Sequence, residues 1–150
     1  MPRAEPTRDP ADPVVAVRMS RARKHGTAPG LALRRELHRR GLRFRLQMPV
    51  PGSPRRTIDV ALTRARIAVM VDGCFWHGCP QHEHRPRRNA VWWEWKIAMN
   101  QGRDADTDAL LIAAGWLPLR VWEHEDPVAA ADRVETAWRC RTGRAPRAGR

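Results

Sequence analysis

Residues 71–82 read VDGCFWHGCPQH, and this stretch decides how the rest of the chain can fold. It follows a short apolar run, 67–71, and places Cys74, Cys79 and His82 in a C-x4-C-x2-H spacing. Thiolate and imidazole groups are ligands that zinc prefers, and four of them close a tetrahedral structural site. A small domain with a long irregular loop, here 73–90, gains stability from such a metal. The sequence therefore predicts a structural zinc loop.

The spacing alone leaves the fourth ligand of this site open. His124 follows the next predicted strand, and His77 and His84 compete with it. Unrelated buried cysteines and surface histidines would give the same letters, but three ligand positions within nine residues favour a metal site. The three cysteines of the chain cannot all pair with one another, which favours a reducing cytoplasm over disulfides.

The sequence predicts two strands before this loop. Ile58, Val60 and Leu62 alternate with other residues, as in a half-buried strand, and 67–71 is continuously apolar, as in a central one. The short link between them predicts a hairpin. Since side chains alternate along a strand, Asp59 projects from the face opposite its apolar neighbours.

Asp59 is the candidate for chemistry. A carboxylate in an apolar strand needs a partner, and a bound cation is one such partner. Asp72 ends the neighbouring strand and His77 follows soon after, so the three side chains can meet. A carboxylate on a metal and a histidine that takes a proton from water suffice for phosphodiester hydrolysis. An ion pair between Asp59 and an arginine is the simpler interpretation, and the residues alone favour it.

The remaining pattern predicts one α/β sandwich around a small mixed sheet. Thr27 caps a helix that stops at Gly41, Pro118 places its strand near an edge or bulge, and Asp126 caps the last helix. The expected segments are a disordered leader (1–17), a single domain (18–140) and a basic tail (141–150). Within the domain we expect helices at 27–40, 91–114 (or a broken pair) and 127–140, strands at 44–48, 58–62, 67–71 and 117–121, and a turn-rich loop at 49–54.

The charge of the chain predicts an anionic partner, with nucleic acid as the leading candidate. The formal net charge is +12 over 150 residues. Ten arginines and lysines between residues 18 and 45, Arg18 and Arg21 among them, face only Glu36. No apolar run is long enough to span a bilayer, and the N-terminus lacks the apolar core of a signal peptide.

The chain is rich in tryptophan, with seven in 150 residues. Trp92, Trp93 and Trp95 cannot all share one buried helix face, so some should be exposed, where a ring can stack on or wedge between bases. Core packing is the alternative. We expect it for Trp116, Trp122 and Trp138, whereas for Trp76 and Trp93 the two interpretations are balanced.

The stretch 71–82 is similar to the signature of the very-short-patch-repair (Vsr) endonucleases. Other segments resemble that family in the same order along about residues 18–125. They are Arg18-Met19-Ser20-Arg21, Leu42-Arg43-Phe44-Arg45, the Pro-Gly-x-Pro loop before Asp59, Trp93-x-x-Lys96-Ile97, Asn100, Arg103-Asp104, Gly115-Trp116 and Val121-Trp122-Glu123-His124-Glu125.

The resemblance implies a fold like the PD-(D/E)xK restriction nucleases and a nick 5′ of the thymine in T·G mismatches left by deamination of 5-methylcytosine. It implies magnesium on Asp59 and the main-chain carbonyl of Val71, and His77 as the catalytic histidine. It further implies structural zinc on Cys74, Cys79, His82 and His124, and contacts to DNA by Phe75, Trp76, Trp93, Arg18 and Arg21. The expected setting is the nucleoid in the cytoplasm, as a monomer that works with other mismatch-repair proteins.

The chain departs from the family pattern near the first helix. Many relatives carry a glutamate after the proline there, close to the active site, whereas this chain has Pro29-Gly30. The loop before Asp59 is also longer than the compact Pro-Asp form. Two alternatives therefore stand beside the repair enzyme: a catalytically weakened module that binds mismatched DNA, and a less selective restriction-like nuclease.

Overall fold

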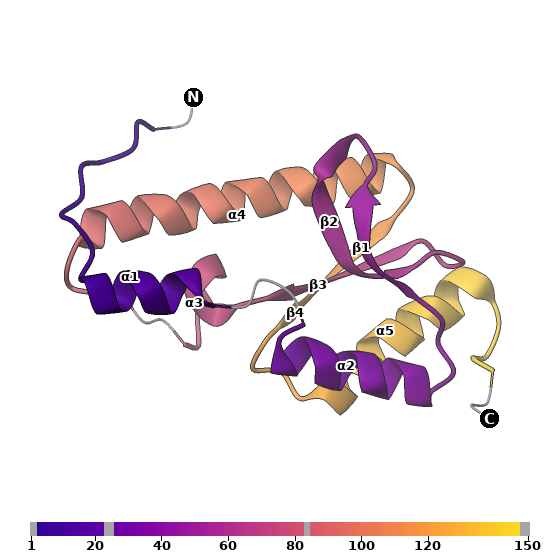
Figure 1. Ribbon diagram of the computed structural model, residues 1–150. Helices are drawn as coiled ribbons and strands as arrows, with labels where there is room; N and C mark the ends of the chain where they lie inside the picture. The colour runs from indigo at the N-terminus through magenta and orange to yellow at the C-terminus, as the bar shows by residue number, and fades with distance from the viewer. Residues whose placement is uncertain (1–2, 23–25, 83–84, 148–150) are drawn as a thin grey trace.

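A computed structural model describes residues 3–22, 26–82 and 85–147. The chain forms a four-stranded sheet with helices packed on both faces (Figure 1). In chain order the elements are α1 (Pro13–Ser20), α2 (Ala28–Arg39), β1 (Arg45–Val50), β2 (Ser53–Leu62), β3 (Ile67–Asp72), α3 (Cys74–His77), α4 (Ala90–Ala113), β4 (Leu117–Trp122) and α5 (Pro127–Thr142).

The sheet is mixed, as the sequence predicts. Its strand order is β1-β2-β3-β4, with antiparallel pairing up to β3 and parallel pairing between β3 and β4. The predicted hairpin of β2 and β3 is confirmed. Pro118 lies in β4, the strand at one edge of the sheet, where a missing N–H costs no ladder hydrogen bond on the open side.

Two apolar layers hold the helices to the sheet. On one face, Leu37 of α2 and Val134 of α5 are fully buried against β2, β3 and β4. On the other, Leu111 of the long helix α4 packs on Ala61 and Ala68. Figure 1 shows this arrangement, with α4 on one side of the sheet and α2 and α5 on the other. No helix in the described part of the chain is long and apolar enough to cross a membrane.

The turn-rich loop expected at 49–54 is wrong in extent. β1 continues to Val50 and β2 starts again at Ser53, so only Pro51 and Gly52 remain as the turn. Gly52 has φ 80°, which a residue with a side chain rarely adopts. The prolines that suggested a loop are tolerated because Pro49 lies on the edge strand β1.

The N-terminal segment, for which the sequence predicted no regular structure, contains helix α1, capped by the Asp12 carboxylate on Val14 N–H. The expected boundary at residue 17 therefore falls inside a helix. Ahead of α1, the chain lies along the start of α4: Trp92 Nε1 donates to Glu5, and Trp95 Nε1 donates to the carbonyl of Arg3. These contacts use polar groups and main chain, so they leave no apolar period in the sequence. A short helix, α3, likewise interrupts the loop expected at 73–90.

Candidate active site and metal centre

The predicted metal ligands converge at one end of the sheet. The sulfur and ring-nitrogen atoms of Cys74, Cys79, His82 and His124 all lie within 4.8 Å of one another. His124 Nδ1 lies 3.1 Å from Cys74 Sγ and 3.6 Å from Cys79 Sγ, and His82 Nδ1 lies 3.8 Å from Cys79 Sγ. Zinc bonds of about 2.0–2.3 Å in a tetrahedron give ligand separations of roughly 3.3–3.8 Å. The four residues therefore fit a tetrahedral metal ion.

Local structure explains why these ligands meet. Cys74 opens α3, and Gly78 ends it in the left-handed region at φ 66°, which returns the chain so that Cys79 N–H bonds to the carbonyl of Cys74. A side chain at Gly78 would be strained at this φ, and its Cβ would lie 2.7 Å from Gln101 and 2.9 Å from Ile97 of α4, so these side chains would have to shift. His124 is delivered by the end of β4. His84, another candidate ligand from the sequence, lies outside the described residues.

Both thiols respond to this environment. Burial, together with the neighbouring Cys79 and Glu123, raises the pKa of Cys74 to about 11. Burial opposes ionisation of Cys79 as well, but hydrogen bonds from His82 and backbone N–H groups lower its pKa. A buried thiol whose pKa is raised in this way needs a cation to become a thiolate, which is what a metal ion in the cluster supplies.

Asp59 lies where the β2–β3 ladder ends. Backbone pairing runs from Leu62–Ile67 to Val60–Val69 and stops there. The Asp59 carboxylate accepts the next hydrogen bond, from Val71 N–H at 2.9 Å. Because the N–H and C=O of one strand residue point to the same edge, the carbonyl of Val71 also faces this side. Among residues 3–22, 26–82 and 85–147 no arginine forms an ion pair with Asp59, so the described part of the chain gives no support to the simpler sequence interpretation.

Asp59, Val71, Gln47, Thr27 and Gly30 line a small pocket. The other Asp59 oxygen accepts a hydrogen bond of 3.3 Å from the Gln47 amide. The pocket thus offers a carboxylate, with a main-chain carbonyl on the same edge of the sheet, and both are oxygen ligands of the kind that magnesium takes. Gly30, the position at which the chain departs from the family pattern, lies in the wall of this pocket.

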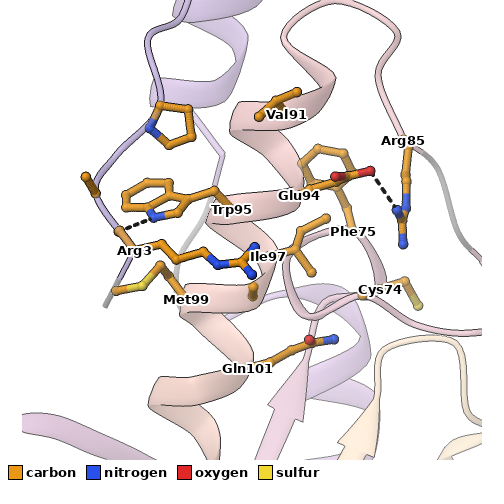
Figure 2. Close-up of a pocket in the computed structure, with 14 residues that line it drawn as sticks. Arg3, Cys74, Phe75, Arg85, Val91, Glu94, Trp95, Ile97, Met99 and Gln101 are labelled. Atoms are coloured by element: carbon orange, nitrogen blue, oxygen red, sulfur yellow. Dashed lines mark hydrogen bonds and ion pairs between the residues drawn. The ribbon is translucent and has the colours of Figure 1, made fainter. Parts of the chain in front are cut away.

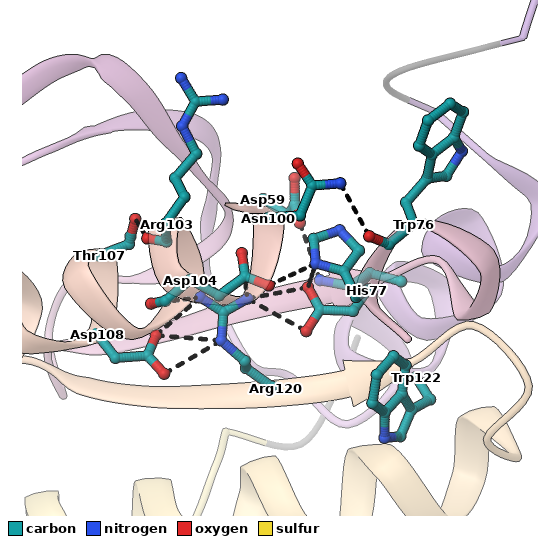
Figure 3. Close-up of polar contacts among 12 residues, drawn as sticks. Asp59, Trp76, His77, Asn100, Arg103, Asp104, Thr107, Asp108, Arg120 and Trp122 are labelled. Carbon is teal, nitrogen blue, oxygen red and sulfur yellow. Dashed lines mark hydrogen bonds and ion pairs between the residues drawn. The ribbon is translucent and has the colours of Figure 1, made fainter. Parts of the chain in front are cut away.

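His77 is held by carboxylates rather than by the metal cluster (Figure 3). Its Nδ1 lies 2.5 Å from an oxygen of Asp104 on α4 and 3.9 Å from Asp72 at the end of β3. Asp72 follows Val71, whose N–H bonds to Asp59, and Figure 3 shows His77 and Asp59 in the same part of the molecule, near the end of β3. Burial lowers the pKa of His77, but the hydrogen bond to Asp104 and the charge of Asp72 outweigh burial and raise it overall. The ring is therefore a stronger base than an isolated histidine.

Arg120 fills the centre of this acidic group. Its guanidinium lies 3.0 Å from Asp72, 3.5 Å from Asp104 and 2.9 Å from Asp108 (Figure 3). Burial raises the pKa of Asp72, and the charges of Arg120 and His77 offset this only in part. Asp72, His77 and Asp104 are close enough to hold a metal ion. Because Arg120 already supplies a positive charge there, the pocket at Asp59 is the better cation site.

Three aromatic rings gather beside α3. The centroid of Phe75 lies 5.2 Å from that of Trp76 and 5.0 Å from that of Trp93. Trp76 is 37% exposed, which is high for a tryptophan. Helix α1 faces Phe75 and Trp76 across an open hollow, and Arg18 and Arg21 lie on its wall. The aromatic cluster and the basic helix thus share one surface.

A further hollow lies elsewhere. It separates the N-terminal segment from α4 and α3, with Trp95, Phe75 and Met99 among its walls (Figure 2). Neither Asp59 nor His77 lines it. Its walls are largely apolar and carry no candidate acid or base of the group described above, so we do not assign the chemistry to it.

Three residues of the site were not assigned a role from the sequence. Asp104 belongs to a segment that resembles the Vsr family, Arg103-Asp104. Its spacing was a usable signal of a polar helix face, because Asn100, Asp104 and Asp108 are four residues apart and share one face of α4. Arg120 in the middle of a strand was a weaker signal. Nothing in the sequence indicated Gln47.

Comparison with known proteins identifies the family. The model of the family described as DNA mismatch endonuclease Vsr matches residues 12–83. The type II nicking enzyme V.XorIIP of Xanthomonas oryzae pv. oryzae is 38% identical over 112 residues, which cover 71% of this chain and 77% of that protein. The chain belongs to the Vsr family. It is therefore a DNA endonuclease, which is a hydrolase, and its substrate is DNA.

Other relatives agree with this assignment to the Vsr family. The type II nicking enzyme V.NaeI of Lentzea aerocolonigenes is 40% identical over 110 residues, and the match covers 72% of this chain but 66% of that protein, just under two thirds of its length. The type II nicking enzyme V.NmeDIP of Neisseria meningitidis serogroup C is 32% identical over 131 residues, which cover 83% of this chain and 86% of that protein.

Proposed function

We propose that this Vsr-family chain nicks duplex DNA on the 5′ side of the thymine in a T·G mismatch, by magnesium-dependent hydrolysis. The observation that carries the proposal is the arrangement where the β2–β3 ladder ends, at the C-terminal end of β3. There Asp59 bonds to Val71, and the next residue, Asp72, lies beside the His77–Asp104 pair. On this proposal the sheet corresponds to that of the PD-(D/E)xK nucleases.

Asp59 and the main-chain carbonyl of Val71 would hold magnesium. The ion supplies positive charge that stabilises the phosphate as the bond breaks. Magnesium commonly keeps several water ligands and uses one or two carboxylates, so a pocket with a single carboxylate suits it. The bond from Val71 N–H to Asp59 fixes the carboxylate beside that carbonyl.

His77 would accept the proton of the attacking water. Asp104 holds Nδ1, which leaves Nε2 as the nitrogen that faces the reaction. Asp104 also raises the basicity of the ring, and Gln101 of α4 fixes the backbone of the residue through a hydrogen bond to its carbonyl. A general base that is fixed in this way contributes on the order of 10²–10⁴-fold to the rate.

The aromatic cluster would open the DNA. Phe75, Trp76 and Trp93 can wedge beside the mismatch, since a weakly stacked step is easier to unstack than a matched one. Asn100 donates a hydrogen bond to the carbonyl of Trp76, which holds the exposed ring in place. Arg18 and Arg21, both exposed on or next to α1, would contact phosphates.

The cluster of Cys74, Cys79, His82 and His124 would hold zinc, in a structural role. All four positions are taken by side chains, so no site is left for substrate, as in other closed structural sites. We propose that the protein acts as a monomer, with other mismatch-repair proteins as partners.

Gly30 favours one competing function. Its place in the wall of the Asp59 pocket means that no carboxylate projects from α2 toward the metal position. A module that binds mismatched DNA but cleaves it weakly would have the same wedge and the same zinc loop. A less selective restriction-like nuclease is the other alternative.

A nicking assay separates these functions. End-labelled duplexes that differ only by T·G or T·A at one position are incubated with zinc-loaded protein, with magnesium or with EDTA. We expect a single nick 5′ of the mismatched thymine, in magnesium only. Tight binding to T·G without a nick would indicate the binding module, and equal cleavage of both duplexes would indicate the less selective nuclease.

A further inference from the structure

Gln47 has a backbone conformation that its side chain disfavours. Its φ is 50°, in the left-handed region, although it lies within strand β1. Two other residues with side chains have positive φ in the described chain, Arg66 in a turn and Asn89 at the start of α4, and both are in places where such angles are common. A strained residue inside a strand is retained only where the surroundings hold it, and such residues cluster at functional sites.

The strained residue lies directly opposite Asp59. The pairs Leu46–Val60 and Met48–Ile58 flank it, so the register places Gln47 across from the candidate metal ligand. Its Nε2 donates to Asp59 Oδ1 at 3.3 Å, and its Oε1 accepts a hydrogen bond of 2.8 Å from the Thr57 hydroxyl. Because Thr57 engages the amide oxygen, the amide N–H is the group turned toward Asp59.

We propose that Gln47 is a positioning residue for the metal site: it orients the Asp59 carboxylate so that its remaining lone pairs point into the pocket. The inference rests on the proposed function, in which Asp59 holds magnesium. Val71 N–H fixes one carboxylate oxygen and Gln47 fixes the other, so the group cannot rotate. The pocket has Gly30 where a second carboxylate could help to hold the ion, so it depends more strongly on the orientation of Asp59.

A comparison of variants separates this role from a merely structural one. Gln47→Gly removes the amide and also relieves the backbone strain, so we expect an unchanged or higher melting temperature. Gln47→Asn keeps an amide and tolerates the same φ, but it is one methylene too short to reach both partners. Arg66→Gly is the matched control, since it relieves a positive φ outside this pocket.

Two readouts are measured on zinc-loaded, full-length protein. Binding of Mn²⁺ is followed by electron paramagnetic resonance, with Asp59→Asn as the background, and nicking of a T·G duplex is measured in single turnover with magnesium. For both Gln47 variants we expect metal affinity and rate to fall about 10- to 100-fold, as for other groups that orient metal ligands. Thr57→Val should cause a smaller loss in the same direction, and Arg66→Gly should cause none.

The outcomes are distinct for the inference and for the function on which it rests. If the Gln47 variants match the wild type in Mn²⁺ affinity and rate per folded molecule while Asp59→Asn abolishes both, the positioning role is wrong and the metal site stands. If Gln47→Gly lowers only the melting temperature, the residue is structural. If Asp59→Asn nicks at the wild-type rate, the proposed function itself fails.

Discussion

His77 shows how much of the proposed chemistry depends on single contacts. Its ring is oriented by Asp104, and it lies next to the metal cluster in sequence without being one of the four converging ligands. We expect His77→Ala to reduce single-turnover nicking by roughly 10²–10⁴-fold, since a fixed general base contributes that much. Asp104→Asn should lower the rate in the same direction. The zinc content of both variants, measured by atomic absorption, should stay near one equivalent. If His77→Ala loses zinc but keeps normal activity per folded molecule, His77 is a ligand of the metal cluster and not the general base.

Only part of the candidate site can be predicted from single residues in the sequence. Asp59 is conspicuous as a carboxylate in an apolar strand, but the residues alone favour an ion pair, and its role as a metal ligand comes from the resemblance to the Vsr family. The C-x4-C-x2-H spacing indicates three of the four converging ligands and leaves the fourth open. Gln47 could not be predicted, because its role depends on a backbone angle and on the register of β1 against β2. The position of Arg120 among three carboxylates depends on how α4 packs across β4, which a single sequence does not show.

Among the elements, the loop that carries α3 connects the metal cluster to the active site. Its cysteines are buried and its end packs on α4 through Gly78, so the same few residues place His77 and Trp76. We expect Cys79→Ala to leave the chain poorly folded, because loss of a ligand removes the folding free energy that the metal contributes. Circular dichroism and metal analysis check this. Purified wild-type protein without zinc near one equivalent, or a cooperative native-like melt of the variant, would contradict it.

The order of elements could be predicted better than their extents. Apolar alternation located β1, β2 and β4, a continuous apolar run located β3, and capping residues located α2 and α5. The prolines near Pro51 suggested a loop where an edge strand tolerates them, and the contacts of residues 3–10 with α4 are made by groups that leave no periodic pattern. Local signals thus indicate the elements, whereas the way in which neighbours stabilise an irregular segment requires the fold.

For the whole molecule, the net charge of +12 makes binding to DNA depend on salt. Each phosphate contact releases bound counterions, so log K falls with log salt by a slope of about 0.9 per contact. We expect the double variant Arg18→Ala, Arg21→Ala to reduce this slope by about 2, with mismatch preference largely kept. Arg139→Ala on α5, whose guanidinium pairs with Glu135, is the control and should leave the slope unchanged. Fluorescence anisotropy across salt concentrations measures this slope. If the double variant has the same slope as the wild type, α1 does not contact the DNA.

The proposed chemistry depends on Asp59, which would organise the cleavage of DNA where the β2–β3 ladder ends. The most direct test measures binding and single-turnover nicking of one T·G duplex by the wild type and by Asp59→Ala, in magnesium. We expect the variant to lose nicking altogether and still to bind the mismatch, at equal or higher affinity because repulsion between carboxylate and phosphate is gone. Nicking by Asp59→Ala at the wild-type rate would contradict the proposed active site as a whole.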